Sequence, residues 1–192
     1  MGQSLNNYLE TLIHSRANGS ALTAAAAASA LPAAAKITLP PGHFGVVGKA
    51  IRIRASGRIS CAVTTPGTGR FDVRFIDSAG TTVVVFDGLA MNLNVVAKTN
   101  VHWELDVTLV ADVIGSAAQL FPSCCRWASE AVVGSPLPTV GGSGQLLLPV
   151  ATAPAVGAAF DATKSNQIDL FFTQTVATGS MTLHELEITA LN

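Results

Sequence analysis

The stretch KAIRIRASGRISCAVTT, residues 49–65, alternates between two kinds of side chain. From residue 51 to residue 64, and apart from Gly57, its odd-numbered positions are apolar, and its even-numbered positions are mostly polar: Ile51, Ile53, Ala55, Ile59, Cys61 and Val63 against Arg52, Arg54, Ser56, Arg58, Ser60 and Thr64. Successive side chains of a strand point to opposite faces, so the pattern predicts one long strand with a buried and a solvated face. Because the alternation continues through Gly57, this glycine indicates a bend or a close backbone approach, not a strand end.

A second long strand is predicted over residues 101–113. Its apolar face carries Val101, Trp103, Leu105, Val107, Leu109, Ala111 and Val113, and its other face carries His102, Glu104, Asp106, Thr108 and Asp112. If both strands lie in one sheet, these acids can stand opposite Arg52, Arg54 and Arg58. Two long apolar faces require a second sheet to cover them.

Shorter strands are predicted over residues 36–39, 70–77, 81–87, 120–133, 145–150, 167–176 and 180–191, separated by Gly, Pro, Asn and Asp. In the last of them the alternation changes phase after Leu183, which indicates a bulge near His184 and Glu185. We therefore predict an all-β domain over residues 36–192, with two antiparallel sheets packed face to face in a jelly roll. An immunoglobulin-like sandwich is the alternative, disfavoured by the strand lengths and by the missing Cys…Trp…Cys pattern.

Residues 1–35 are predicted to form a separate N-terminal arm. Leu5, Tyr8, Leu9, Leu12 and Ile13 recur at helical spacing, which predicts a short amphipathic helix over residues 3–16 that packs on its own domain or on a neighbouring subunit. The following stretch ALTAAAAASALPAAA, residues 21–35, is uncharged, and Pro32 limits any helix there. Its small side chains favour an extended arm that lies close against another surface.

Charged residues form only 12% of the 192-residue chain, about half of the usual ~25%. Hydrophobic residues reach 49%, and the mean hydropathy is +0.45, yet no apolar run approaches the ~18 residues that cross a bilayer. We expect the excess apolar surface to be buried against other protein chains, with no membrane partner. The net charge of −1 and the lack of a basic cluster argue against a nucleic-acid partner.

No catalytic, cofactor-binding or metal-binding motif is found in the sequence. The four histidines are scattered, and no phosphate-binding loop or nucleophile elbow is present. The cysteines, Cys61, Cys124 and Cys125, are expected to be reduced, as in a cytosolic protein. The N-terminus lacks the pattern of a secretory signal. We expect a protein that is not an enzyme and has no cofactor.

Four stretches resemble virion structural proteins of tailed bacteriophages: GKAIRIRASGRIS (48–60), VVFDGLAMNLN (84–94), SEAVVGS (129–135) and LLLPVATAPAVG (146–157). Such proteins include capsid decoration (cement) proteins, which are commonly trimers with a β-rich body and an N-terminal arm that grips the capsid. Others belong to necks, tails or fibres. The resemblance implies a structural role in the virion. The four stretches contain no active-site motif.

The leading interpretation is a capsid decoration protein that is made in the host cytoplasm and located on the capsid surface. Its expected partners are the major capsid protein and further copies of itself, as a homotrimer. The residues expected to form the capsid or oligomer interface are Leu5, Tyr8, Leu9, Leu12, Ile13, Leu22 and Leu31. The alternative is a tail, neck or fibre module that binds a host-surface glycan through the loops of residues 134–157.

Overall fold

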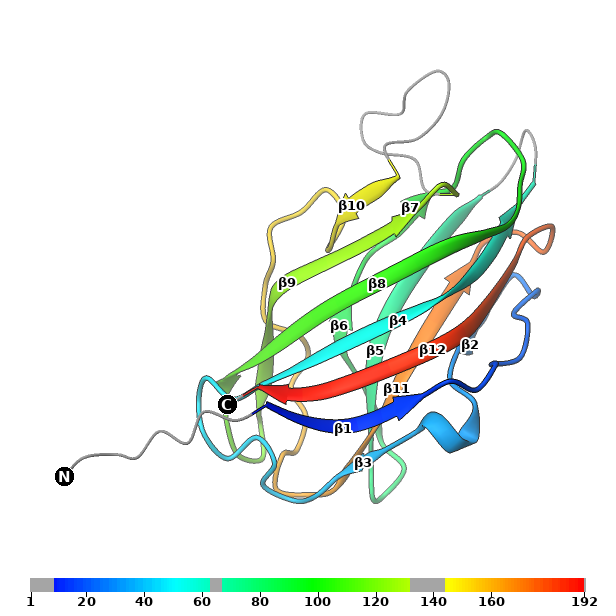
Figure 1. Ribbon diagram of the computed structural model, residues 1–192. Coiled ribbons are helices and arrows are strands. Elements are labelled where there is room, and N and C mark those ends of the chain that lie inside the picture. The colour runs from blue at the N-terminus through cyan, green and yellow to red at the C-terminus, as the bar shows by residue number, and fades with distance from the viewer. Residues whose placement is uncertain (1–8, 63–66, 132–143, 192) are drawn as a thin grey trace.

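The computed structural model describes residues 9–62, 67–131 and 144–191, which form two antiparallel sheets packed face to face (Figure 1). Sheet A has six strands in the order β1 (Leu9–Ser15), β12 (Ser180–Leu191), β4 (Ala50–Cys61), β8 (Lys98–Val113), β9 (Gln119–Ser129) and β10 (Gln145–Leu147). Sheet B has the order β2 (Ala27–Ser29), β11 (Asn166–Gln174), β5 (Thr68–Asp77) and β6 (Thr82–Asp87). Two short strands join sheet B, with β3 (Thr38–Leu39) on β11 and β7 (Met91–Asn92) on β5. The all-β sandwich is confirmed, and its jelly-roll connectivity stays a prediction.

The two predicted long strands are neighbours in sheet A. β4 and β8 pair antiparallel from Ala50 opposite Val110 to Ile59 opposite Val101, and the odd-numbered residues of β4 are buried as expected. Gly57 lies opposite Leu183, where a Cβ atom would stand only 2.0 Å from the carbonyl oxygen of Thr182. The predicted close backbone approach at Gly57 is therefore confirmed. The predicted bulge is also confirmed, because the register of β12 on β4 shifts between Leu183 and Glu185.

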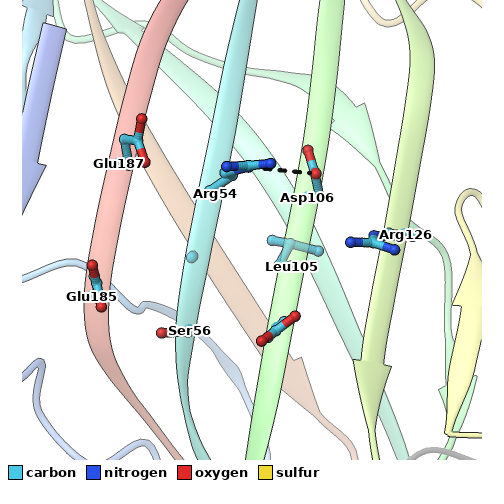
Figure 2. Close-up of a pocket in the computed structure, with 9 residues that line it drawn as sticks. Arg54, Ser56, Leu105, Asp106, Arg126, Glu185 and Glu187 are labelled. Carbon is cyan, nitrogen blue, oxygen red and sulfur yellow. Dashed lines mark ion pairs between the residues drawn. The ribbon is translucent and has the colours of Figure 1, made fainter. Parts of the chain in front are cut away.

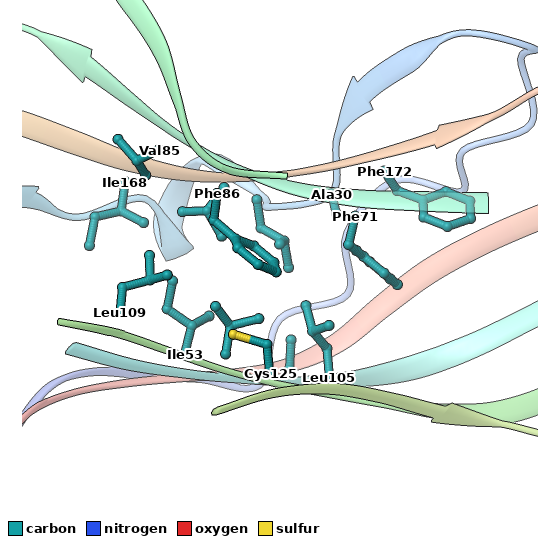
Figure 3. Packing of buried hydrophobic residues seen from close by; sticks show 14 of the residues in the cluster. Ala30, Ile53, Phe71, Val85, Phe86, Leu105, Leu109, Cys125, Ile168 and Phe172 are labelled. Atoms are coloured by element: carbon teal, nitrogen blue, oxygen red, sulfur yellow. The ribbon is translucent and has the colours of Figure 1, made fainter. Parts of the chain in front are cut away.

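Aromatic side chains from both sheets meet in the core. Trp103 of β8 and Trp127 of β9 are fully buried, and both contact Phe71 of β5, with ring centroids 5.1 and 5.0 Å apart. Phe172 of β11, directly opposite Phe71 in sheet B, packs on it with ring centroids 4.9 Å apart. Figure 3 shows how Phe71 and Phe172 from one sheet face Leu105 and Cys125 from the other. Burial of these rings holds the two sheets together.

The predicted N-terminal helix is wrong in its described part, because residues Leu9–Ser15 form the edge strand β1. A short isolated helix is marginal in water, whereas β12 offers this segment backbone hydrogen-bond partners along one side. The register shifts between Thr11 and Ile13, so that Leu12 and Ile13 both pack on the core. Because of this register shift, two consecutive apolar residues face the core, which is a spacing that the sequence shares with an amphipathic helix.

The alanine-rich segment lies across the chain's own sandwich. Leu22 pairs with Met181, β2 pairs with β11, and the amide of Ala30 donates to the carbonyl of Leu170 at 2.8 Å. A short 3-10 helix, η1 (Ala33–Ala35), follows, with Ala35 fully buried. The small side chains allow this close approach, as their composition indicated.

A buried carboxylate fixes the same segment to sheet B. Asp169 of β11 is 1% exposed and accepts a hydrogen bond from the hydroxyl of Ser29 at 2.6 Å. Its other oxygen accepts one from the ammonium group of Lys36 at 2.5 Å. Charge-assisted bonds of this kind are stronger than neutral ones. Asp169 therefore links residues 29–36 to the body of the protein.

Residues 148–160 close the gap between the edges of the two sheets. The amide of Leu148 donates to Cys125, that of Val150 to Gly88, and that of Gly157 to Leu120, at 2.9, 3.0 and 2.9 Å. This segment therefore bridges the β9 side of sheet A and the β6 side of sheet B. Its alternating Ala, Thr, Pro and Val residues are mostly exposed.

Candidate functional site

The face of sheet A that points away from the core carries arginines and acids from four neighbouring strands. One row of directly paired residues crosses all six strands: His14 on β1, Glu187 on β12, Arg54 on β4, Asp106 on β8, Arg126 on β9 and Leu147 on β10. We call these residues the charged row. Figure 2 shows its central members side by side on neighbouring strands, with acids and bases alternating. The arginines of β4 and the acids of β8 thus share one face, as predicted.

Asp106 is the most buried charge in this row, at 7% exposure. Arg52 binds it with two hydrogen bonds, including one from Nε to Oδ1 at 2.9 Å, and Arg54 Nε lies 3.7 Å from Oδ2. Burial raises the pKa of Asp106, but the hydrogen bond and the charge of Arg52 outweigh it. The pKa therefore lies below its ordinary value, and Asp106 is ionised at neutral pH.

A shallow depression of about 330 Å³ lies over the charged row. On one side of it, Glu185 accepts a hydrogen bond from His14 at 2.9 Å, which holds the pKa of Glu185 below its ordinary value. On the other side, Glu104 contacts His102 at 3.2 Å. These acids and Asp106 are therefore all matched by basic groups within the chain.

Glu187 and Arg126 are the charges of the row that have no ion pair among residues 9–62, 67–131 and 144–191. The carboxylate of Glu187 accepts a hydrogen bond from the hydroxyl of Thr189 at 3.1 Å. Arg126 is exposed and acts on Asp106 only through its charge. Both side chains remain available for a charged group from outside the chain.

An apolar row crosses the same face nearer one end of the sheet. It consists of Leu9, Leu191, Ala50, Val110 and Phe121, each directly opposite the next. Large exposed apolar side chains lie in and around this row. In Figure 1, the ribbon at this end of sheet A lies near the marked C-terminus. We call this set the apolar end: Leu9, Val46, Val47, Val113, Ile114 and Phe121, exposed by 69, 68, 59, 39, 42 and 36%. Such clusters are typical of protein-binding surfaces.

A second hollow, of about 410 Å³, lies beside β6 and is lined by the segment of residues 149–158. An ion pair between Arg70 and Asp87, at 2.6 Å, forms part of its wall. The remaining wall is mostly Val, Ala and Pro. Nothing in this hollow combines a nucleophile with a base.

The titratable groups show little reactive chemistry. Within the described residues, no three His, Cys, Asp or Glu side chains come together in a way that could hold a metal ion. Burial raises the pKa of Cys125 to about 12, so this thiol is protonated and unreactive at neutral pH. No helix in the described part of the chain is long and apolar enough to cross a membrane.

Of the seven predicted interface residues, the five that the structure describes do not form one exposed surface. Leu5 and Tyr8 lie outside the described residues; Leu12, Ile13 and Leu22 pack partly on the core; and Leu31 is buried in it. Leu9 is the one that is fully available, in the apolar end. That these seven side chains form an interface stays a prediction. Val46, Val47 and Ile114 were missed, because loop residues follow no periodicity that could mark them as exposed.

The comparisons with known proteins add little. No protein-family model matches the sequence, and no curated protein matches it. Among solved structures, the chain has a distant likeness to the CBM2 module of the evolved Dit of Lactobacillus casei BL23 phage J-1, with a TM-score of 0.29 and 12% identity. The likeness covers 82% of this chain and 68% of that one. At this degree of similarity it supports no conclusion about fold or function.

Proposed function

We propose that the protein is a non-enzymatic structural protein of a tailed-phage virion, a jelly-roll capsid decoration protein. It binds its protein neighbours, the major capsid protein foremost, through the apolar end of sheet A. The resemblance of four stretches to phage virion proteins motivates the virion role. The observation that carries the binding role is the apolar end itself.

The exposure of these side chains is costly for an isolated chain. Leu9, Val46 and Val47 are each more than half exposed and belong to a single end of the molecule. Fully burying one such side chain contributes about 1.5–3 kcal/mol. A partner that covers the apolar end therefore gains much of its binding free energy there, without any catalytic group.

The test uses particles from the phage that encodes the protein. Electron microscopy of virions carrying the Val46→Asp/Val47→Asp variant is expected to show shells without the protein, because two buried charges oppose binding. The matched control is Val95→Asp/Val96→Asp, at 47 and 46% exposure in a loop at the opposite end of β4 and β8, and it is expected to bind normally. Normal shell occupancy by the first variant, or a location only on the tail, would overturn the proposal.

The alternative function, glycan binding by a tail or fibre module, has less support. Sugars often stack on exposed tryptophan or tyrosine, but Trp103 and Trp127 are both fully buried. The loop suggested for this role, residues 134–157, lies partly outside the described residues. We therefore do not propose it.

A further inference from the structure

The charged row has an antisymmetric order of charges about the centre of sheet A. Starting from the boundary between β4 and β8, the first residues on either side are Arg54 and Asp106. The next are Glu187 on β12 and Arg126 on β9. At these two steps a base on one side is matched by an acid on the other; the outermost members, His14 on β1 and Leu147 on β10, lie beyond this pattern.

A surface with this property is complementary to itself. Consider two copies packed face to face and related by a two-fold axis that runs along the strands between β4 and β8. The axis places Arg54 opposite Asp106 of the second copy and Glu187 opposite Arg126 of the second copy. Each contact is made twice, as in any isologous interface. Opposite charges then face each other at all four positions, with Glu187 and Arg126 as the open pair and Asp106 already bound by Arg52 of its own chain.

The neighbouring rows obey the same operation. In the apolar row, Leu191 meets Phe121 of the second copy, and Ala50 meets Val110. In the row on the other side, Ser56 meets Glu104. Within the described rows from Ala50 to Ser56, the axis brings no two like charges together. In the apolar row, apolar groups therefore meet apolar groups. In the other flanking rows, Arg52, Glu104 and Glu185 meet the uncharged Thr108, Ser56 and Ala128 of the second copy.

We infer that the outer face of sheet A binds a second copy of this chain in a two-fold pair. The unpaired state of Glu187 and Arg126 within one chain supports this partner, because the second copy provides the missing counter-charge for both. An isologous pair gives a dimer in place of the trimer expected from the resemblance. The axis also brings the two apolar ends to the same end of the pair. The inference does not depend on the virion role, so either can fail alone.

Sedimentation velocity of the purified full chain over a concentration series tests the pairing. Wild type is expected to form a dimer, and Glu187→Arg or Arg126→Glu is expected to raise the dissociation constant at least about tenfold, because each creates two like-charge contacts. The double variant Glu187→Arg/Arg126→Glu is expected to regain the wild-type constant within about threefold, since a restored charge pair recovers most of the loss. Within one chain these residues are three strands apart, about 14 Å, so a direct interaction between them is largely screened.

Two further variants complete the design. Glu130→Arg makes the same change in net charge on the turn after β9, outside the interface, and is expected to dimerise like wild type. Glu187→Gln removes the charge without reversing it and is expected to weaken the dimer less than Glu187→Arg. It replaces Glu187→Arg in the test if circular dichroism shows that the charge reversal disturbs folding. A monomeric or trimeric wild type, single reversals without effect, or a double variant that stays dissociated would each overturn the inference.

Discussion

Replacing Gly57 by alanine places a methyl group where the backbone of β12 already lies. The new Cβ atom would stand 2.0 Å from the Thr182 oxygen, 2.9 Å from Trp103 Nε1 and 3.0 Å from Leu183 Cα. The first distance is more than an ångström short of the 3.4 Å at which ordinary contacts begin. The obstacle is backbone and a fully buried indole, so it cannot rotate away. β12 must therefore separate from β4 at the bulge.

The cost follows from two effects. Overpacking of a rigid core costs about 1–3 kcal/mol. Displacing the Thr182 carbonyl also removes the acceptor of the Trp103 indole N–H, now at 3.3 Å, and an unsatisfied buried donor costs about 1–3 kcal/mol. We expect Gly57→Ala to lower the free energy of unfolding by about 2–6 kcal/mol, a large share of the usual 5–15 kcal/mol.

Urea unfolding followed by tryptophan fluorescence measures this loss, because both tryptophans lie in the core. In thermal unfolding the same change corresponds to a midpoint lowered by roughly 4–24 °C for a chain of this size. Ser56→Ala, on the solvated face of the same strand, is the control and is expected to stay within about 0.5 kcal/mol of wild type. A Gly57→Ala protein with the wild-type urea midpoint would refute the reasoning.

Three other changes test the remaining features. Asp169→Ala leaves Lys36 and Ser29 without their acceptor and is expected to cost about 3 kcal/mol in urea unfolding, since Lys36 is partly exposed; a loss below about 1 kcal/mol would contradict the role given to Asp169. His43 has its pKa lowered to about 4 by burial and by Lys49, so the unfolded chain binds its proton first, and the free energy of unfolding should fall as the pH drops from 6.5 to 4. In His43→Gln, the free energy of unfolding measured by urea at several pH values should depend less on pH across that window. An unchanged pH dependence would contradict the role given to His43. A chain that begins at residue 36 loses β1, β2 and buried Leu31, so circular dichroism should show it unfolded or much less stable; native stability would show that this segment is dispensable.

The long strands could be predicted because their signal is local. Period-two alternation over more than ten residues identified β4 and β8, and a phase change within β12 located the bulge at Leu183 to Glu185. The role of Gly57 followed from the same alternation, since a glycine in an unbroken strand needs a packing reason. The local sequence determines each of these features, with little contribution from residues far away in the chain.

The N-terminal strand and the charged row could not be predicted in the same way. The Leu9, Leu12 and Ile13 spacing fits a helix, and only the pairing with β12, more than 170 residues away, makes a strand with an irregular register. The charged row joins residues from six strands, and its order depends on the register of each pair. Opposition of arginines and acids was foreseeable, but the antisymmetric order was not.

The pairing of Leu9 with Leu191 has a practical consequence for building with this domain. Polypeptide that leads into β1 and polypeptide that continues from β12 meet the sandwich at adjacent points on one edge. The domain therefore suits insertion into a surface loop of another protein, since the two ends of the interrupted host loop can stay close together. A cargo peptide joined at either position would emerge beside the same corner, next to the apolar end.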